Sequence, residues 1–440
     1  MSRSNRRTFL KHAGLGIAGT TTMGLARSAS AGQANGKLVV GAIGCGGRGT
    51  YLARWFAGEK DSTVAYVCDP DAARAGKAAE AVAKAGGNSP KVVKDLRHIL
   101  DDKAVDAVTV GTPDHWHGPA TILACQAGKH VYVEKPVSHN VREGRLMVEA
   151  ARRHKRIVQA GTHSRSLAHV IRGIELIRSG AIGDVLVAKA WNSQRRANIG
   201  HADPSKPPAG FDYDLWVGPA PFRPYRKTCH HYTWHWWYDF GTGDIGNDGV
   251  HELDIARWGL GVETHPSTVA AVGGKYFFDD DQQFPDTHYV AYEYPGDGKV
   301  GSKRQLVFEQ RIWSPYVQEG MENGNAFYGT KGVLLLGKKE GWQCFGPRNK
   351  LVKQMKAGEP DAPPHPRRFM DAIKTGKLPN ADIEVGHLSA ALCHLGNISA
   401  RLGRSLRFDP KSEQIQGDDE AAHLLRRTYR DGHWAVPKGA

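Results

Sequence analysis

The sequence predicts an α/β protein with an N-terminal doubly wound parallel sheet and a C-terminal α/β domain whose sheet is open and mostly antiparallel. Between residues 36 and 163, short apolar runs alternate with helix-like segments, the pattern of parallel strands joined by helices. Beyond residue 184, successive apolar runs are separated mainly by short turns, which favours antiparallel pairing. The 440 residues suit two domains. We therefore expect domains at 36–163 and 164–440, preceded by a signal at 1–31.

The first 31 residues have the features of an export signal. Arg6 and Arg7 form a twin arginine, residues 13–25 are mildly apolar, and Ala29-Ser30-Ala31 suits signal cleavage. Asn5 departs from the pattern, because such signals usually carry serine there. The segment is similar to a twin-arginine signal, so we expect a periplasmic or otherwise exported protein. No apolar run reaches the ~20 residues that span a bilayer, so no membrane insertion is expected after signal removal.

Charge and cysteine content limit the function classes. The formal charge is +14, of which the signal segment carries +5, and no long Lys/Arg run occurs elsewhere. A mixed solvated surface is therefore favoured over a nucleic-acid face. None of the six cysteines forms a CxxC pair, so zinc-ribbon and thioredoxin-like spacings are absent. A disulfide between distant cysteines stays open.

A glycine-rich turn near the start predicts a dinucleotide site. Gly44, Gly46 and Gly49 follow one apolar run and open a helical pattern, and the next apolar run ends in Asp69. Such glycines permit a tight turn, backbone approach to a pyrophosphate and close helix–strand packing, and the helix N-terminus favours phosphate charge. Asp69 can accept hydrogen bonds from both ribose hydroxyls and repels a 2′-phosphate. This favours NAD over NADP as the cofactor, although Arg74 can soften the preference.

Ligands of doubly wound sheets lie outside the carboxyl ends of the strands, so the residues there are the candidates. Lys135 follows a strand, and Pro136 fixes the turn that holds it at the cofactor crevice. The expected cofactor-binding residues are Gly44, Gly46, Gly47, Arg48, Gly49, Asp69, Thr112, Pro113, His117, Glu134 and Lys135. From the same strand ends, His115, Trp116 and His163 are expected to contact substrate.

The second half contains a long irregular segment, 193–247, and a loop of this length is usually functional. Its stretch 230–240 is dense in aromatic residues, which either stack on sugar C–H faces or pack at a domain interface. Tyr232, Trp236 and Trp237 are the expected substrate contacts. We expect no metal site, because the histidines of this stretch lack a supporting carboxylate pattern.

His251 is the expected general base. A helix is predicted to begin near Asn247 or Asp248, which puts His251 in the first turn, where the helix dipole keeps the imidazole neutral. Asp248 and Asp254, three residues away on either side, share its helix face and are candidates to orient it.

The sequence resembles the glucose–fructose oxidoreductase / inositol dehydrogenase / rhizopine-catabolism (Gfo/Idh/MocA) family over nearly all of the chain after the signal. The resemblance rests on the dinucleotide pattern, Glu134-Lys135-Pro136, the strand end "TPDHWH" and "GTGDIGNDGVHELD" at 241–254. It implies a Rossmann domain, a C-terminal α/β domain and hydride transfer between NAD(P) and a sugar or cyclitol hydroxyl. Lys135 and His251 would carry the chemistry, with Glu134 orienting the loop. Family members often have aspartate where this chain has Asn247, so either Asp244 or Asp248 is expected to take its place.

Three functions compete. The first is a sugar or polyol oxidoreductase. The second is a redox-neutral glycoside hydrolase or lyase that forms a transient keto sugar and then restores its NAD. The third is a non-catalytic sugar-binding protein, which the presence of Lys135 and His251 disfavours. The periplasm holds no ready pool of free NAD, so we expect a tightly bound, recycled cofactor. Because an open sheet face favours self-association, a homo-oligomer is expected.

Overall fold

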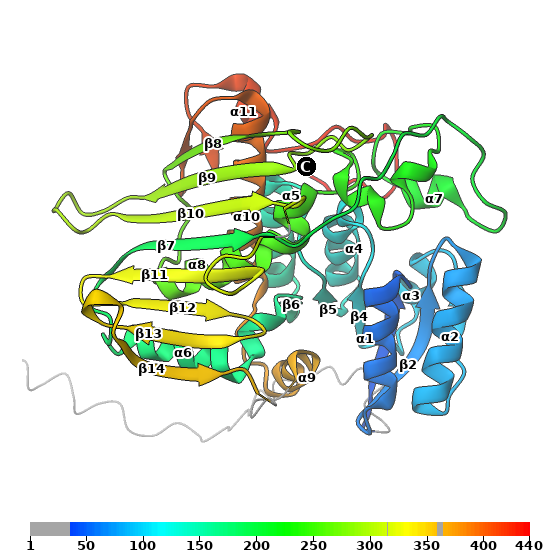
Figure 1. Cartoon of the computed structure of the whole chain (residues 1–440). Helices are drawn as coiled ribbons and strands as arrows, with labels where there is room; N and C mark the ends of the chain where they lie inside the picture. The colour runs from blue at the N-terminus through cyan, green and yellow to red at the C-terminus, as the bar shows by residue number, and fades with distance from the viewer. Residues whose placement is uncertain (1–35, 315, 359–363) are drawn as a thin grey trace, which may run out of the picture.

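The computed structural model describes residues 36–314, 316–358 and 364–440, and it contains two sheets with associated helices (Figure 1). The predicted fold class is confirmed, since one sheet is wholly parallel and the other mostly antiparallel. The expected signal at residues 1–31 lies outside the described residues. Within the described ranges, we find no helix with the length and apolarity needed to cross a membrane.

The first sheet has six parallel strands in the order β3-β2-β1-β4-β5-β6. Every residue of the central strand β4 is buried, as expected for a strand covered on both faces. The strand order reverses between β1 and β4, which places the ligand crevice at their carboxyl ends. The strands are β1 (Leu38–Ile43), β2 (Ser62–Cys68), β3 (Lys91–Val93), β4 (Ala107–Val110), β5 (His130–Val133) and β6 (Val158–Ala160). The helices between them are α1 (Gly47–Gly58), α2 (Ala72–Gly86), α3 (Arg97–Asp101), α4 (Asp114–Gln126) and α5 (Val141–Arg153).

The second sheet has ten strands in the order β14-β13-β12-β11-β7-β10-β9-β8-β15-β16. Only the β7–β10 pair is parallel among these described strands. The strands are β7 (Val185–Asn192), β8 (Thr268–Gly274), β9 (Thr287–Tyr294), β10 (Arg304–Arg311), β11 (Asn323–Gly329), β12 (Val333–Gly337), β13 (Gly341–Phe345), β14 (Leu351–Lys356), β15 (Leu406–Asp409) and β16 (Gln414–Ile415). Strand β11 contains Asn and Gly residues of low strand propensity, and its pairing with β7 and β12 makes it a strand.

Helices cover one face of this sheet and form its core with it. They are α6 (Ala168–Arg178), α8 (Val250–Leu260) and α10 (Ile383–Leu402), and the short helices α7 (Tyr213–Val217) and α11 (Asp419–His423) lie outside this layer (Figure 1). The opposite face carries the exposed side chains of Val272, Tyr289 and Tyr328.

The expected domain boundary at 163/164 does not separate all of the structure, because a later segment packs on the first domain. Helix α9 (His365–Thr375) returns to the first domain and packs against β5, where the ring of Phe369 meets that of Tyr132 at 6.0 Å. His365 also lies with Nε2 2.7 Å from the main-chain oxygen of Ala160 at the end of β6. The range 164–440 therefore includes a helix that completes the parallel-sheet domain, a contact between distant segments that local sequence does not reveal.

Candidate active site

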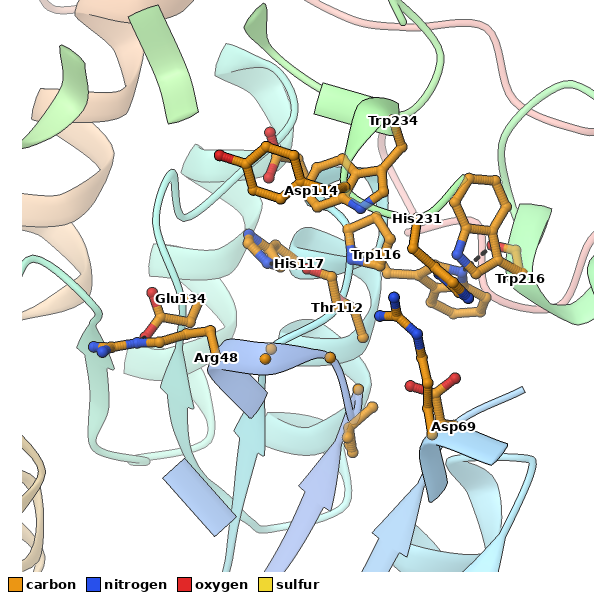
Figure 2. Close-up of a pocket in the computed structure, with 18 of the residues that line it drawn as sticks. Arg48, Asp69, Thr112, Asp114, Trp116, His117, Glu134, Trp216, His231 and Trp234 are labelled. Atoms are coloured by element: carbon orange, nitrogen blue, oxygen red, sulfur yellow. Dashed lines mark hydrogen bonds and ion pairs between the residues drawn. The ribbon is translucent and has the colours of Figure 1, made fainter. Parts of the chain in front are cut away.

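A cavity of about 500 Å³ lies at the carboxyl ends of β1, β2, β4 and β5. Figure 2 shows Asp69 at one end, Glu134 and Arg48 at the other, and Trp216, His231 and Trp234 facing them from the second domain. The expected cofactor residues that line the cavity are Gly44, Gly46, Gly47, Arg48, Asp69, Thr112, Pro113, His117, Glu134 and Lys135. Gly49 does not line the cavity; it packs against the Gly44 backbone.

The glycine-rich turn has the space that a dinucleotide requires. Gly44 has φ +84°, and a Cβ there would come within 2.6 Å of the Gly111 backbone. A Cβ on Gly49 would lie 1.8 Å from the Gly44 oxygen, so only glycine permits this approach of α1 to the turn. By contrast, nothing lies within 4 Å of a Cβ on Gly47, which leaves the helix N-terminus open toward a phosphate.

Asp69 ties the turn to the end of β2. Its carboxylate accepts hydrogen bonds from the Cys45 N–H at 2.7 Å and the Asp71 N–H at 2.9 Å. Burial raises the pKa of Asp69, and these amides with nearby Arg74 partly oppose the rise. The carboxylate also lines the cavity, where a ribose would meet it. The turn, the open helix end and Asp69 together fit a nicotinamide dinucleotide.

Lys135 connects the two domains at the other end of the cavity. Its ammonium donates a hydrogen bond to the main-chain oxygen of Asn247 and lies 3.5 Å from the Asn247 side-chain oxygen. The preceding residue, Glu134, is buried and accepts a hydrogen bond from Arg48 Nε at 2.7 Å. Burial works against ionisation of Glu134, but Arg48 and Lys135 together outweigh it and lower the pKa of this carboxyl.

His251 lies in the same cavity, but its helix begins earlier than expected. A π-helical turn at Ile245–Gly249 runs directly into α8, so His251 is not in the first turn of the helical segment. Burial is the main reason that the pKa of His251 lies well below its ordinary value, followed by neighbouring His163, Lys338 and Lys135. Burial and the neighbouring positive charges therefore account for the neutral imidazole expected of a base, and the π-helical turn puts His251 further from the helix start than predicted.

The carboxylates expected to orient His251 bind other groups. Asp248 accepts hydrogen bonds from Asn323 and Lys338, each at 3.0 Å, and Asp254 pairs with Arg165 at 2.7 Å. Within the described residues, the buried Nδ1 of His251 has no hydrogen-bond partner. The neighbour that its ring does meet is His163, with ring centroids 4.8 Å apart. Asp248 and Asp254 therefore do not orient His251 as predicted, because each has a cationic partner from another element.

Asp244 supports Lys135 indirectly. It accepts hydrogen bonds from Asn247 Nδ2 at 3.0 Å, Asn192 Nδ2 at 2.9 Å and Arg196 Nε at 2.9 Å. Since Asn247 in turn accepts from Lys135, a continuous polar chain runs from Arg196 through Asp244 and Asn247 to the lysine.

Asp114 is a cavity residue to which the sequence analysis gave no role. Its buried carboxylate accepts a hydrogen bond from Thr242 Oγ1 at 2.7 Å. Burial raises the pKa of Asp114 to about 7, with the Thr242 hydrogen bond and the charge of Lys135 acting in the opposite direction. A strand-end aspartate in "TPDHWH" was visible in the sequence, but its burial was not.

Three of the six expected substrate residues line the cavity, namely Trp116, His163 and Tyr232. His115 instead lies with Nε2 3.0 Å from the Trp216 main-chain oxygen, and Trp237 Nε1 donates to the Thr228 oxygen at 2.9 Å. Trp236 is buried outside the cavity lining. Adjacent residues of the aromatic stretch point in different directions, so the cavity also receives His231, Trp234 and His235 from this stretch, and Trp216 from outside it.

The segment that supplies these side chains is fastened to the first domain beside α2. His231 Nε2 lies 2.8 Å from Asp71 Oδ2, and the Asp212 N–H donates to the Pro70 oxygen at 2.9 Å. The sequence showed no carboxylate near the histidines of the aromatic stretch, but the fold brings Asp71 to His231. The donor atoms of Asp71, His230 and His231 lie within 4.8 Å of one another.

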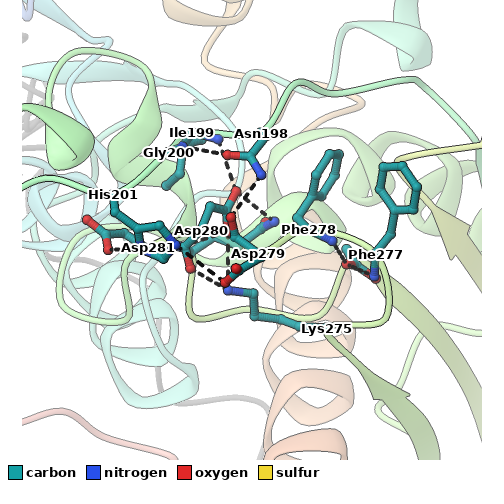
Figure 3. Close-up of polar contacts among 12 residues, drawn as sticks. Asn198, Ile199, Gly200, His201, Lys275, Phe277, Phe278, Asp279, Asp280 and Asp281 are labelled. Carbon is teal, nitrogen blue, oxygen red and sulfur yellow. Dashed lines mark hydrogen bonds and ion pairs between the residues drawn. The ribbon is translucent and has the colours of Figure 1, made fainter.

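The same segment is fixed at its start to the loop after β8 (Figure 3). Asp280 accepts from the Ile199 N–H at 3.0 Å, and Asp281 lies 3.0 Å from His201 Nδ1. The long segment 193–247, held near its start and again at Asp212 and His231, contributes Trp216, His231 and Trp234 to the cavity lining, and we call it the cover.

Two family models together match most of the chain. Residues 38–162 match the family described as "Oxidoreductase family, NAD-binding Rossmann fold" (GFO_IDH_MocA). Residues 189–436 match "Oxidoreductase family, C-terminal alpha/beta domain" (GFO_IDH_MocA_C2).

Curated relatives match over part of their length. A "Glycosyl hydrolase family 109 protein" of Saccharopolyspora erythraea is 33% identical over 211 residues, which cover 42% of this chain and 45% of the relative. An "Alpha-N-acetylgalactosaminidase" of Shewanella oneidensis is 28% identical over 211 residues, 43% of this chain and 46% of the relative. The chain thus spans less than half the length of the curated relatives it matches.

Solved structures show the same fold over both domains. A levoglucosan dehydrogenase in complex with NADH and levoglucosan has a TM-score of 0.64 at 19% identity, covering 84% of this chain and 99% of that one. The aldose-aldose oxidoreductase from Caulobacter crescentus has a TM-score of 0.61 at 21% identity, covering 84% and 100%.

Proposed function

Because the chain belongs to the Gfo/Idh/MocA oxidoreductase family, we propose that it transfers hydride between NAD and a hydroxyl-bearing carbon of a sugar, glycoside or cyclitol. The observation that carries this proposal is the meeting of Lys135 and His251, from different domains, in the cavity that Asp69 and the glycine turn also line. Bound NAD would supply the hydride acceptor.

The residues of the chain have complementary tasks in this proposal. Lys135, held by Asn247, hydrogen-bonds the reacting hydroxyl and favours its deprotonation. His251 is neutral because of its low pKa, so its imidazole can accept the proton. Trp116, Tyr232 and His163 contact the sugar, and the aromatic rings stack on its C–H faces.

The finer proposal is that the cofactor stays bound and is restored in each cycle. The cover contributes Trp216, His231 and Trp234 to the cavity and is fixed to the first domain, so cofactor release requires breaking those contacts. A redox-neutral hydrolase or lyase that acts through a keto sugar is the second candidate. It is favoured by the relatives named as glycosyl hydrolases.

Two measurements separate these functions. Mass spectrometry of denatured, freshly purified protein should find about one NAD per chain. Mixing with the true sugar or glycoside should give a transient absorbance of reduced nicotinamide that decays without added oxidant. Free NADH accumulating in proportion to product would instead identify a conventional dehydrogenase, and absence of both bound NAD and turnover would favour a sugar-binding protein.

Export and self-association complete the proposal. The twin arginine at Arg6-Arg7 supports export of the folded chain with its cofactor, and loss of export in an Arg6→Lys/Arg7→Lys variant tests it. The exposed Val272, Tyr289 and Tyr328 on one sheet face support a homo-oligomer. Light scattering on the purified protein should give a mass above that of one chain.

A further inference from the structure

A second cavity, of about 250 Å³, lies between the start of α5, the end of α10 and the C-terminal residues 423–428. Thr242 separates it from the catalytic cavity, since this residue lines the second cavity while its hydroxyl binds Asp114 in the first. The proposed redox chemistry uses no residue of this second cavity.

Hydrogen-bond donors lie unused in its wall. Asn140 is 4% exposed, and its side-chain oxygen accepts from the Glu143 N–H at 2.9 Å while its Nδ2 has no partner within the described residues. Arg427 binds Glu143 through Nε and the His115 oxygen through Nη2, each at 2.8 Å, and leaves its buried Nη1 without a partner. Unpaired buried donors are costly, so these two groups point to an acceptor that fills the cavity.

The mouth of this cavity has an excess of positive charge. Glu143 balances Arg427, and Asp239 balances Arg223. Arg401 stacks over the Tyr238 ring at 4.4 Å, and Arg426 Nη1 donates to the Ala440 oxygen at 3.3 Å. The oxygen that Arg426 meets belongs to the terminal carboxylate of the described chain, whereas Arg401 has no carboxylate partner among the described residues. The positive charge of Arg401 therefore remains for a ligand.

The other walls suit a compact, partly apolar ligand. The rings of Tyr238 and Phe284 meet edge to face at 4.5 Å, and Ile398 and Leu424 are also in the lining. The volume is below the ~300 Å³ at which pockets for drug-sized molecules begin. We propose that this cavity binds a monosaccharide-sized ligand that carries a phosphate or carboxylate, with its anionic group at Arg401 and its other oxygens accepting hydrogen bonds from Asn140 and Arg427.

Calorimetric titration of the purified, NAD-saturated protein with four probes tests the proposal. The probes are glucose 6-phosphate, glucuronate, neutral glucose and inorganic phosphate. We expect at least one anionic sugar to bind more tightly than both glucose and inorganic phosphate. Which of the two binds more tightly distinguishes a phosphate from a carboxylate ligand.

Charge variants locate the binding. Arg401→Gln should weaken binding of the preferred anionic sugar about tenfold, as expected for loss of a charge-assisted hydrogen bond. Arg172→Gln, on the exposed surface of α6, removes the same charge and should not weaken it. Equal affinities for anionic and neutral sugars would overturn the proposal, as would an unchanged affinity for the anionic sugar in the Arg401→Gln variant. Inorganic phosphate binding as tightly as the sugars would overturn the assigned ligand size.

Discussion

The ammonium of Lys135 donates a hydrogen bond to the main-chain oxygen of Asn247, which joins the parallel-sheet domain to the helical segment that bears His251. The side chain of Asn247 is fixed in turn by Asp244 at 3.0 Å. Asp248 and Asp254 bind other groups, so neither carboxylate orients His251. Asn247 positions the lysine.

Replacing Lys135 or His251 by Ala should lower turnover by ~10²–10⁴-fold, the usual contribution of a positioned acid or base. NAD should remain bound, because the glycine turn and Asp69 are unchanged. Steady-state rates and NAD titration of each variant check this. Lys331→Ala, on the surface, is the control. Near-normal turnover of either variant on the true substrate would remove that residue from the mechanism.

Replacing Asp69 by Ser should weaken NAD binding and shift the relative preference toward NADP. The carboxylate that would bind the ribose hydroxyls is lost, and repulsion of a 2′-phosphate is lost with it. Since Asp69 also accepts from the Cys45 N–H, some loss of affinity for both cofactors is expected. The informative quantity is therefore the ratio of the two dissociation constants, and an unchanged ratio would contradict the assignment.

The pH profile of the wild type should contain an ionisation with a pKa of about 7 from Asp114. The carboxyl is protonated below that pH and becomes a carboxylate beside the Lys135 ammonium above it, which strengthens the hold on the lysine. We expect kcat/KM to change through this range in the wild type, and Asp114→Asn to remove the inflection because its amide does not titrate. An identical profile in the variant would assign the ionisation to another group.

Replacing His231 by Ala should speed NAD release about tenfold, because the hydrogen bond that fastens the cover to Asp71 is lost. The pKa of His231 is lowered to about 4, mainly by burial, so the neutral ring makes this contact throughout the neutral range. Stopped-flow displacement of bound NAD measures the rate, with the exposed His98→Ala as the control. Equal release rates in both variants would show that this contact does not hold the cover.

Local sequence was sufficient to predict the dinucleotide turn. Gly44, Gly46 and Gly49 act within one strand–turn–helix unit, so their spacing alone carries the geometry, and Asp69 ends the next strand of the same unit. Lys135 was predictable for the same reason, since a residue that follows a parallel strand must lie at the ligand edge of the sheet.

Only the tertiary structure decided which side chains enter the cavity from the cover, and which groups surround His251. Trp234 and His235 line the cavity while Trp236 and Trp237 do not, because irregular backbone has no fixed period from which direction can be read. Asp248 turns to Lys338, and Asp71 meets His231, across 90 and 160 residues of chain. Such contacts depend on how the two sheets and the cover pack together, and pairing energy between distant groups leaves no local pattern in the sequence.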